Sequence, residues 1–152
     1  MSDKYMKVEK IDHGTVINHI LPARAFDVLR VLGLSNDKTM SILVNSHSKK
    51  GGRKDILKLE DVELSAEAAN LVALVSPQAT INIIVGGKVV KKFNAEAPKV
   101  VRGILTCSNP NCISNQNEPI TAEFRLSPDE SHRYVCTYCD RDIIDLVKRI
   151  SP

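Results

Sequence analysis

The sequence predicts an α+β protein of two domains, and two observations lead to that prediction. Over residues 1–97, short segments of alternating apolar and polar residues, typical of strands, surround two segments with the apolar spacing of helices. All the cysteines, in contrast, lie in the last third of the chain as two short-spaced pairs. We therefore expect an N-terminal domain of residues 1–97 and a smaller C-terminal domain of residues 98–152, joined by the polar, proline-containing stretch 94–99.

The first expected elements are two strands and a helix. Residues 5–12 alternate apolar side chains with charges and predict a strand, and the β-branched run 15–20 predicts a strand that returns after a turn at Gly14. Pro22 predicts the start of a helix, because its missing N–H costs nothing in the first turn. Apolar residues then recur at helical spacing as far as Gly33, which we expect to cap the helix C-terminus.

The next stretch predicts a pair of strands followed by a second helix. Residues 39–45 and 54–60 both have strand-like patterns, and we expect them to pair with each other. Ser65 is a good N-cap residue, because its hydroxyl can accept a hydrogen bond from a free N–H of the first turn. The second helix is therefore expected to begin there and to end at Pro77.

A second hairpin completes the N-terminal domain. Residues 79–85 and 88–93 predict its strands, and the pair Gly86-Gly87 predicts a tight turn, because glycine tolerates positive φ at both central positions. The middle of the domain thus has the order β-α-β-β-α-β, the split βαβ or ferredoxin-like pattern, with hairpin strands added at each end. We expect both helices to cover one face of the sheet.

The four cysteines have the spacing of a metal site. They are arranged as Cys107-x4-Cys112 and Cys136-x2-Cys139, so each short loop can direct both its sulfurs toward one point. This pattern favours a tetrahedral, structural zinc site with one ion per chain. Two disulfides, four buried free thiols and a redox dithiol at the second pair are the alternatives. Disulfide frameworks are typical of secreted chains, and a redox C-x-x-C normally opens a helix after a strand.

Short strands are expected around that site. We expect one strand leading to Cys107 and others near residues 120–126 and 132–136, which together predict a small β zinc ribbon of the rubredoxin-like kind. The insert 113–135 has few large apolar residues, so the metal is expected to replace much of a core and to supply folding free energy. The tail is expected to be amphipathic, with one apolar face formed by Ile143, Ile144, Val147 and Ile150.

Composition and motifs argue against several classes of protein. The longest apolar run is far too short to span a membrane, and the first five residues lack the apolar core of a signal segment, so we expect a cytoplasmic protein. A net charge of +3 and 4% aromatic residues give little support for nucleic-acid binding. The sequence has no phosphate loop, no Rossmann fingerprint and no recognisable nucleophile motif. A binding or regulatory protein is therefore favoured over an enzyme.

A zinc ribbon that binds nucleic acid is the main alternative function. Such a ribbon would show clustered lysines and arginines with aromatics between its cysteine pairs. The insert 113–135 instead has an excess of acidic residues, with Glu118, Glu123, Asp129 and Glu130 against Arg125 and Arg133. This excess disfavours phosphate binding by the insert.

Four motifs together resemble the regulatory chain of aspartate carbamoyltransferase. They are residues 14–22 (GTVINHILP), 52–60 (GRKDILKLE), 77–82 (PQATIN) and Cys107-x4-Cys112-Ile113-Ser114, and the resemblance runs from about residue 6 to residue 142 in the family's order and spacing. It implies a non-catalytic, allosteric subunit of a pyrimidine-biosynthesis enzyme. In that family the first domain binds nucleoside triphosphates (ATP, CTP or UTP), regulatory chains form homodimers, and the zinc domain docks on the catalytic chain.

The resemblance also implies which residues form the nucleotide site. Carried over by position, they are Val8, Glu9, Lys10, Ile11, Val16, Asn18, His19, Lys58, Asn82, Ile84, Val89 and Lys92. Lys58, Lys92 and His19 offer positive or donor groups suited to phosphate and ribose oxygens, and the apolar members offer walls to a base. Without the resemblance, strand lysines are usually solvated edge charges, and the alternative for His19 is a sheet-edge residue that only forms hydrogen bonds.

Two departures from the family pattern and one docking residue complete the expectations. Asn18 stands where the family commonly has Asp, which keeps an acceptor, adds a donor and removes a charge, so effector discrimination is expected to be weaker. Gly87 stands where relatives can carry a larger side chain against the base. Asn111, in the loop between the first cysteines, is the residue expected to contact the catalytic chain.

Overall fold

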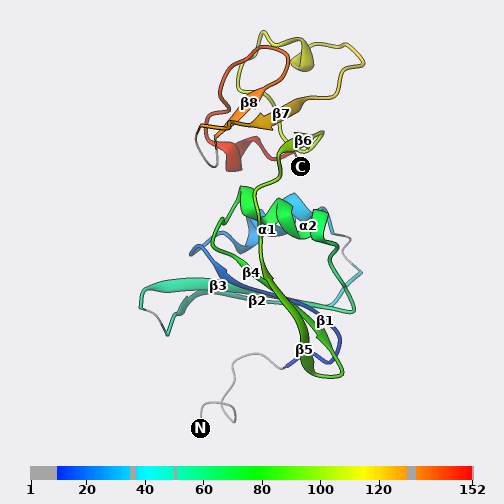
Figure 1. Cartoon of the computed structure of the whole chain (residues 1–152), viewed down its shortest axis with the longest axis vertical. Helices are drawn as coiled ribbons and strands as arrows, with labels where there is room; N and C mark the ends of the chain where they lie inside the picture. The colour runs from blue at the N-terminus through cyan, green and yellow to red at the C-terminus, as the bar shows by residue number, and fades with distance from the viewer. Residues whose placement is uncertain (1–9, 35–36, 50, 130–132, 152) are drawn as a thin grey trace.

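The computed structural model describes residues 10–34, 37–49, 51–129 and 133–151. Its N-terminal module, shown in Figure 1, is a five-stranded antiparallel sheet in the order β2-β3-β1-β4-β5 with two short helices. The strands are β1 Gly14–Ile20, β2 Met40–His47, β3 Arg53–Glu60, β4 Thr80–Val85 and β5 Lys88–Asn94; the helices are α1 Ala25–Leu32 and α2 Ala66–Leu71, the latter continued by the 3-10 turn Val72–Leu74. This strand order confirms the predicted split βαβ arrangement, with β5 added at one edge. Most of the predicted strand at 5–12 lies outside the described residues.

The hydrophobic core of this module lies between the sheet and the two helices. Ile17, Leu57 and Ile81 come from three adjacent strands and are fully buried, together with Val28 of α1 and Val72 after α2. Both helices lie on this one face of the sheet, as expected (Figure 1). Because side chains alternate along a strand, the residues between the buried ones point to the opposite face. Since both helices lie on the first face, no helix covers this opposite face in the part of the chain that the structure describes.

Local signals placed two of the four helix ends. The second helix was expected to end at Pro77, but α2 ends at Leu71 and only a 3-10 turn continues it to Leu74. Gly33 ends α1 in the left-handed conformation and its N–H donates to the carbonyls of Leu29 and Arg30, as predicted. Ser65 caps α2 by accepting the N–H of Ala68. The prediction that α1 starts at Pro22 is wrong: Ala23 has a φ of 65°, and the helix begins only at Ala25.

The C-terminal module is a smaller three-stranded antiparallel sheet in the order β6-β7-β8. Its strands are β6 Val100–Arg102, β7 Glu123–Leu126 and β8 Tyr134–Cys136, and 3-10 turns cover Ile113–Asn115 and Leu146–Arg149. Phe124, Tyr134, Val101 and Leu105 are fully buried. The module thus contributes several large buried side chains, although its insert is short of large apolar residues.

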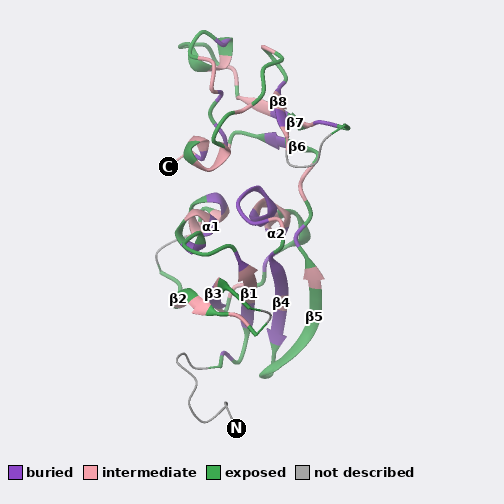
Figure 2. Cartoon of the chain, turned by 90° about the vertical axis from the view of Figure 1, so that its left-hand side faces the viewer, coloured by how far each residue is buried: buried purple, intermediate pink, exposed green. Residues whose placement is uncertain are grey.

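The segment that joins the modules is packed rather than loosely extended. Ala95 is 6% exposed and its N–H donates to the carbonyl of Ala79, and the hydroxyl of Tyr134 donates to the carbonyl of Pro98 at 2.6 Å. In Figures 1 and 2 the two helices lie between the N-terminal sheet and the C-terminal module. The buried apolar residues of both modules form one continuous cluster. We therefore expect the two modules to influence each other's stability.

The C-terminal tail differs from its prediction. Ile150 is 3% exposed, but Ile144 is 63% exposed, so the four isoleucine and valine positions do not share one buried face. The tail is held as extended chain instead: Leu105 and Ile150 form an antiparallel bridge, and a short 3-10 turn precedes it.

Among the described residues, no helix has the length and apolar character that crossing a membrane requires.

Candidate functional site

Four sulfur atoms meet at one point of the C-terminal module. Cys107 and Cys112 lie on the loop that follows β6, Cys136 ends β8, and Cys139 lies in the turn after it. All four Sγ atoms lie within 4.8 Å of one another. Cys107, Cys112 and Cys136 are buried and Cys139 is half-buried. Residues that are far apart in the sequence are thus gathered as the spacing predicted.

The distances between these sulfurs fit a metal site and not a pair of disulfides. The Sγ atoms of Cys107 and Cys139 lie 3.7 Å apart, as do those of Cys112 and Cys136. A disulfide needs about 2.0 Å between its sulfurs. Four sulfurs placed about 2.3 Å from a central zinc ion at the corners of a tetrahedron lie about 3.8 Å apart. These two separations therefore match those of a tetrahedral metal site, and all four sulfurs lie within 4.8 Å of one another.

The thiols differ in how readily they lose a proton. Burial is the main cause that raises the pKa of Cys107 to about 12, and burial also raises the pKa of Cys136. Burial acts in the same direction on Cys112, but hydrogen bonds with Ser114 and, after it, with Cys136 and Cys107 together outweigh it and lower the pKa to about 7. The hydroxyl of Ser114 lies 3.2 Å from that sulfur. A bound metal ion would hold all four as thiolates, because thiolates are the metal-binding form of cysteine.

The first cysteine loop is held in shape by asparagine side chains. Asn109 accepts the N–H of Asn111 on its side-chain oxygen at 3.0 Å, and the N–H of Asn109 points at the Cys107 sulfur at 3.5 Å. The side-chain amide of Asn115 donates to the carbonyls of Cys107 and Asn109. Asn111 itself is exposed. The role of Asn115 was not predicted, and no sequence signal distinguished it from an ordinary loop amide.

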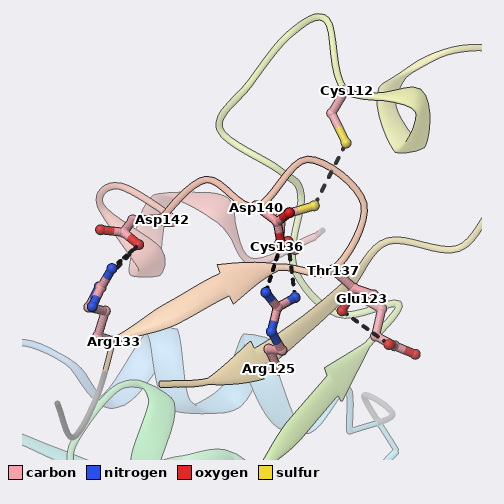
Figure 3. Close-up of polar contacts among 8 residues, drawn as sticks. All are labelled: Cys112, Glu123, Arg125, Arg133, Cys136, Thr137, Asp140 and Asp142. Carbon is pink, nitrogen blue, oxygen red and sulfur yellow. Dashed lines mark hydrogen bonds and ion pairs between the residues drawn. The ribbon is translucent and has the colours of Figure 1, made fainter. Parts of the chain in front are cut away.

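Ion pairs surround the second cysteine loop, as Figure 3 shows. Arg125 of β7 donates to the carboxylate of Asp140 at 2.7 Å and to the carbonyl of Cys136 at 3.4 Å. Arg133 pairs with Asp142 at 3.0 Å. Both pairs are substantially exposed, so we expect each to contribute only about 0–1 kcal/mol. In each of these two pairs an aspartate offsets the charge of the arginine.

A hollow of about 320 Å³ lies on the N-terminal sheet at its helix-free face. Val16, Lys58 and Asn82 meet there because β1 lies between β3 and β4, with Val16 paired to both of the others. The walls are largely apolar, and lysine nitrogens and one amide provide the polar groups. The residues that line the hollow are Lys10, Ile11, Val16, Lys58, Asn82, Ile84, Gly87 and Val89.

Seven of the twelve residues expected in a nucleotide site line this hollow: Lys10, Ile11, Val16, Lys58, Asn82, Ile84 and Val89. Lys92 lies beside it, because it pairs with Asn82 across β4 and β5. Asn18 and His19 do not line the hollow. Val8 and Glu9 lie outside the described residues.

Asn18 and His19 form a local structure of their own at the end of β1. His19 has a φ of 57°, and its own N–H donates to the side-chain oxygen of Asn18 at 2.8 Å. Its ring nitrogen Nδ1 lies 3.2 Å from the hydroxyl of Thr80. The pairing of β1 with β3 shifts register between Ile17 and Ile20. Asn18 thus supports a bulge that turns His19 toward β4.

Lys58 is the most unusual charged group of the hollow. It is only 8% exposed, and its pKa is lowered mainly by burial and further by the positive charge of Lys10. A nearby anion would favour the charged form again, because an opposite charge offsets the cost of burial. Two lysines that approach each other in a hollow with apolar walls therefore suit an anionic ligand that also has an apolar part.

The fold and these two sites define a metal-binding α+β protein without a visible catalytic constellation among the described residues. Family models identify the two modules. Residues 6–96 match the allosteric domain of the aspartate carbamoyltransferase regulatory chain, and residues 99–145 match the metal-binding domain of the same chain. The chain belongs to the family of aspartate carbamoyltransferase regulatory chains.

Individual relatives support the same assignment. The regulatory chain of Methanococcus maripaludis strain S2 is 43% identical over 142 residues, which cover 93% of this chain and 95% of the relative. That of Pyrobaculum arsenaticum is 46% identical over 149 residues, 95% and 99% of the two chains. That of Ignicoccus hospitalis is 48% identical over 140 residues, 90% and 89%. All three are named as the regulatory and not the catalytic chain. This confirms the family resemblance and the assignment as a non-enzyme.

Proposed function

We propose that the chain is the allosteric subunit of aspartate carbamoyltransferase, which binds nucleoside triphosphates (ATP, CTP or UTP) in the hollow of the N-terminal sheet. The observation that carries the proposal is the convergence of Lys10 and Lys58 on one hollow with apolar walls. A nucleoside triphosphate combines a flat, partly apolar base with several negative charges, and the hollow offers a counterpart to each. The family to which the chain belongs gives this binding a regulatory meaning.

The chemistry of the site assigns different parts of the nucleotide to different walls. Ile11, Ile84 and Val89 provide apolar contacts for a base, and the absence of a side chain at Gly87 leaves room beside them. Lys58, inside the hollow, would meet the ribose or a base carbonyl. Lys92 and His19, which do not line the hollow, would meet phosphates that extend past its edge. Hydrogen bonds to charged groups contribute about 1.5–3 kcal/mol each. Loss of one lysine should therefore weaken binding about tenfold or more.

The C-terminal module would hold one structural zinc ion between Cys107, Cys112, Cys136 and Cys139. The four-thiol donor set and the 3.7 Å separations support zinc over harder cations, which prefer oxygen ligands. The ion would lock the two cysteine loops together. We further propose that this module, and the exposed Asn111 in particular, docks on the catalytic chain, and that 98–152 is a separate domain from 1–97.

Regulatory chains are also proposed to form a homodimer through the β2 edge of the sheet. β2 is an edge strand, and Val44 on it is 40% exposed. Phe26, on the neighbouring helix α1, is 61% exposed. In the part of the chain that the structure describes, no strand pairs with the outer edge of β2, and a strand edge with apolar side chains is a ready pairing surface. The assembled protein is expected to be cytoplasmic and to bind neither membranes nor nucleic acid.

The experiment that tests the function combines binding and assembly. The chain would be co-expressed with a catalytic chain from its own genome, and ATP and CTP would be titrated calorimetrically into the complex and into Lys58→Ala and Lys92→Ala variants. Lys91→Ala is the matched control, because Lys91 neighbours Lys92 on β5 but points to the other face. We expect the first two variants to lose about tenfold in affinity and the control to bind normally.

Two outcomes would contradict the proposal in different ways. If Lys58→Ala and Lys92→Ala bind nucleotide as the wild type does, the site is misplaced. If they lose binding while the enzyme still responds to nucleotide, the hollow binds nucleotide but is not the regulatory site. Docking is tested separately: Asn111→Ala should weaken co-purification with the catalytic chain, and Asn117→Ala, at an exposed asparagine of the insert 113–135, should not.

A further inference from the structure

One hydrogen bond joins helix α1 to the far end of the chain. The Nη2 atom of Arg30 donates to the backbone carbonyl of Ile150 at 2.7 Å, although 120 positions separate the two residues. Arg30 lies in the last turn of α1, in the N-terminal module, and Ile150 lies in the C-terminal module. This contact therefore crosses from one module to the other, at the place where Figure 2 shows α1 facing the C-terminal tail.

The guanidinium of Arg30 is held in the orientation that this contact needs. Its other terminal nitrogen, Nη1, donates to the carboxylate of Asp27 at 3.2 Å, one turn earlier on the same helix. Asp27 is also paired with Arg24 at 3.4 Å. Because a guanidinium is planar and rigid, fixing one nitrogen fixes the direction of the other. Asp27 thus directs Arg30 toward the tail.

The acceptor is equally well anchored to its own module. Ile150 is 3% exposed and pairs with Leu105, which is 2% exposed. The N–H of Thr106 donates to the carbonyl of Arg149, and the N–H of Ser151 donates to the carbonyl of Ile104, both at 2.8 Å. The carbonyl of Ile150 is therefore part of the C-terminal module and not of a loose end. It follows a 3-10 turn, where carbonyls need outside donors.

We propose that Arg30, positioned by Asp27, is a latch that couples the stability of helix α1 to the attachment of the C-terminal tail. A change that loosens the tail releases the guanidinium and weakens the last turn of α1, and loosening α1 weakens the tail by the same free energy, because coupling of this kind is reciprocal. The latch concerns the joint between the modules. It holds whether or not the nucleotide and metal assignments above are correct.

The test removes the donor and the acceptor separately and together. The donor is removed by Arg30→Met, which keeps the length of the side chain. The acceptor is removed in a chain that ends at Arg149 with an amidated C-terminus, so that no new carboxylate replaces the carbonyl of Ile150. Arg24→Met is the matched control, because Arg24 also pairs with Asp27 and is similarly exposed, at 47% against 42% for Arg30. Six chains would be compared: the wild type, Arg30→Met and Arg24→Met, each at full length and each shortened to end at Arg149. In every chain, hydrogen exchange would be measured on the last-turn amides of α1, including that of Gly33.

The proposal predicts a specific pattern of exchange rates. In the full-length chain, Arg30→Met should speed exchange of the α1 amides about threefold to tenfold, the size expected for a partly exposed hydrogen bond to a charged group. In the shortened chain the same substitution should have no effect, since its acceptor is gone. Arg24→Met should have the same small effect in both backgrounds. Exchange at Thr106 in full-length Arg30→Met should rise as well, which reports the reciprocal effect on the tail.

The contrary results are equally definite. If Arg30→Met speeds exchange equally in the full-length and shortened chains, Arg30 acts only within its own helix and the latch does not exist. If Arg30→Met has no effect on α1 in the full-length chain, the contact carries no coupling. Should the shortened chain lose the fold of its C-terminal module, the prediction for α1 is unchanged, because the acceptor is absent in either case.

Discussion

The buried carboxylate of Asp55 accepts the backbone N–H of Ala25, the first residue of α1, at 2.9 Å. The same carboxylate accepts the N–H of Ala23 at 3.0 Å and that of Asn45 at 2.7 Å. One acid on β3 therefore satisfies backbone groups at the start of a helix and in the neighbouring strand. Ala23 and Asn45 both have positive φ, so the carboxylate supports two strained points of the backbone at once.

The first prediction is that Asp55→Asn destabilises the N-terminal module by about 1–3 kcal/mol. An amide keeps one acceptor oxygen but places its NH₂ group against a backbone N–H, so at least one buried donor is left without a partner. Asp12→Asn is the control, because the side chain of Asp12 is 79% exposed. Urea unfolding followed by circular dichroism measures both. Equal midpoints for the two variants would show that the Asp55 network adds no stability.

The second prediction concerns Gly14 at the start of β1. Gly14 has a φ of 141°, and a Cβ atom there would collide with the backbone carbonyl oxygen of Leu59. The neighbour is backbone of a central strand and cannot move aside cheaply. Gly14→Ala should therefore lower the unfolding midpoint strongly, whereas Gly51→Ala, at a position with positive φ but open space, should cost less. A milder effect at position 14 than at position 51 would contradict this reading of the β1–β3 contact.

The third prediction is that Lys58→Met makes the free protein more stable at neutral pH. Burial, and then the charge of Lys10, lowers the pKa of Lys58 from 10.5. Between the lowered folded pKa and the ordinary unfolded pKa the unfolded chain binds more protons at this residue, so wild-type stability should rise with pH in that window. Lys58→Met should remove this rise, and the exposed Lys88→Met should keep it. The measurement is the unfolding midpoint of the wild type and of both variants from pH 7 to pH 10.5. The same rise with pH in Lys58→Met as in the wild type would contradict the prediction.

The fourth prediction is that nucleotide binding takes up protons. An anion in the hollow raises the pKa of Lys58 back toward its ordinary value, so the complex binds more protons than the free chain near the lowered pKa. Calorimetric titration in two buffers of different ionisation enthalpy should give different apparent binding enthalpies above neutral pH. The difference should vanish in Lys58→Met. A buffer-independent enthalpy across that range would argue that Lys58 does not meet the ligand.

The fifth prediction is that removing the metal unfolds the C-terminal module first. Elemental analysis should give one zinc per chain, and Cys136→Ser should lower that value and expose the amides of β7 and β8 to exchange. The sheet of the N-terminal module should remain largely protected. Ser108→Ala, which changes the first cysteine loop without removing a sulfur ligand, serves as the control. Metal content near zero in carefully purified native protein would contradict the zinc assignment.

The dimer proposed through β2 can be tested at both sheet edges. Val44→Lys introduces a charge on the β2 edge and should shift the chain toward monomer in analytical ultracentrifugation. Val90→Lys makes the same change on β5, the opposite edge strand, where Val90 is 61% exposed. That variant should keep the wild-type mass. A monomer produced by the second change instead of the first would move the interface to β5.

Local sequence signals determined most of the elements of this fold. The helix ends at Gly33 and Ser65, the turn at Gly86-Gly87 and the strand pattern of the N-terminal domain could all be predicted, because each depends on a few neighbouring residues. The cysteine cluster could be predicted for a related reason: two short loops can present sulfurs only in a limited set of ways. The family could be identified because its motifs stand in register along nearly the whole chain.

Only the tertiary structure decided what those elements do to one another. It placed Asp55 under the start of α1, joined Arg30 to Ile150, and showed that Ile144 and Ile150 do not share a face. It also separated Lys58, inside the hollow, from His19, which a bulge turns toward Thr80. These relationships depend on contacts between residues that are distant in the sequence. Their geometry is fixed by packing across the whole sheet, and no local pattern of residues encodes it.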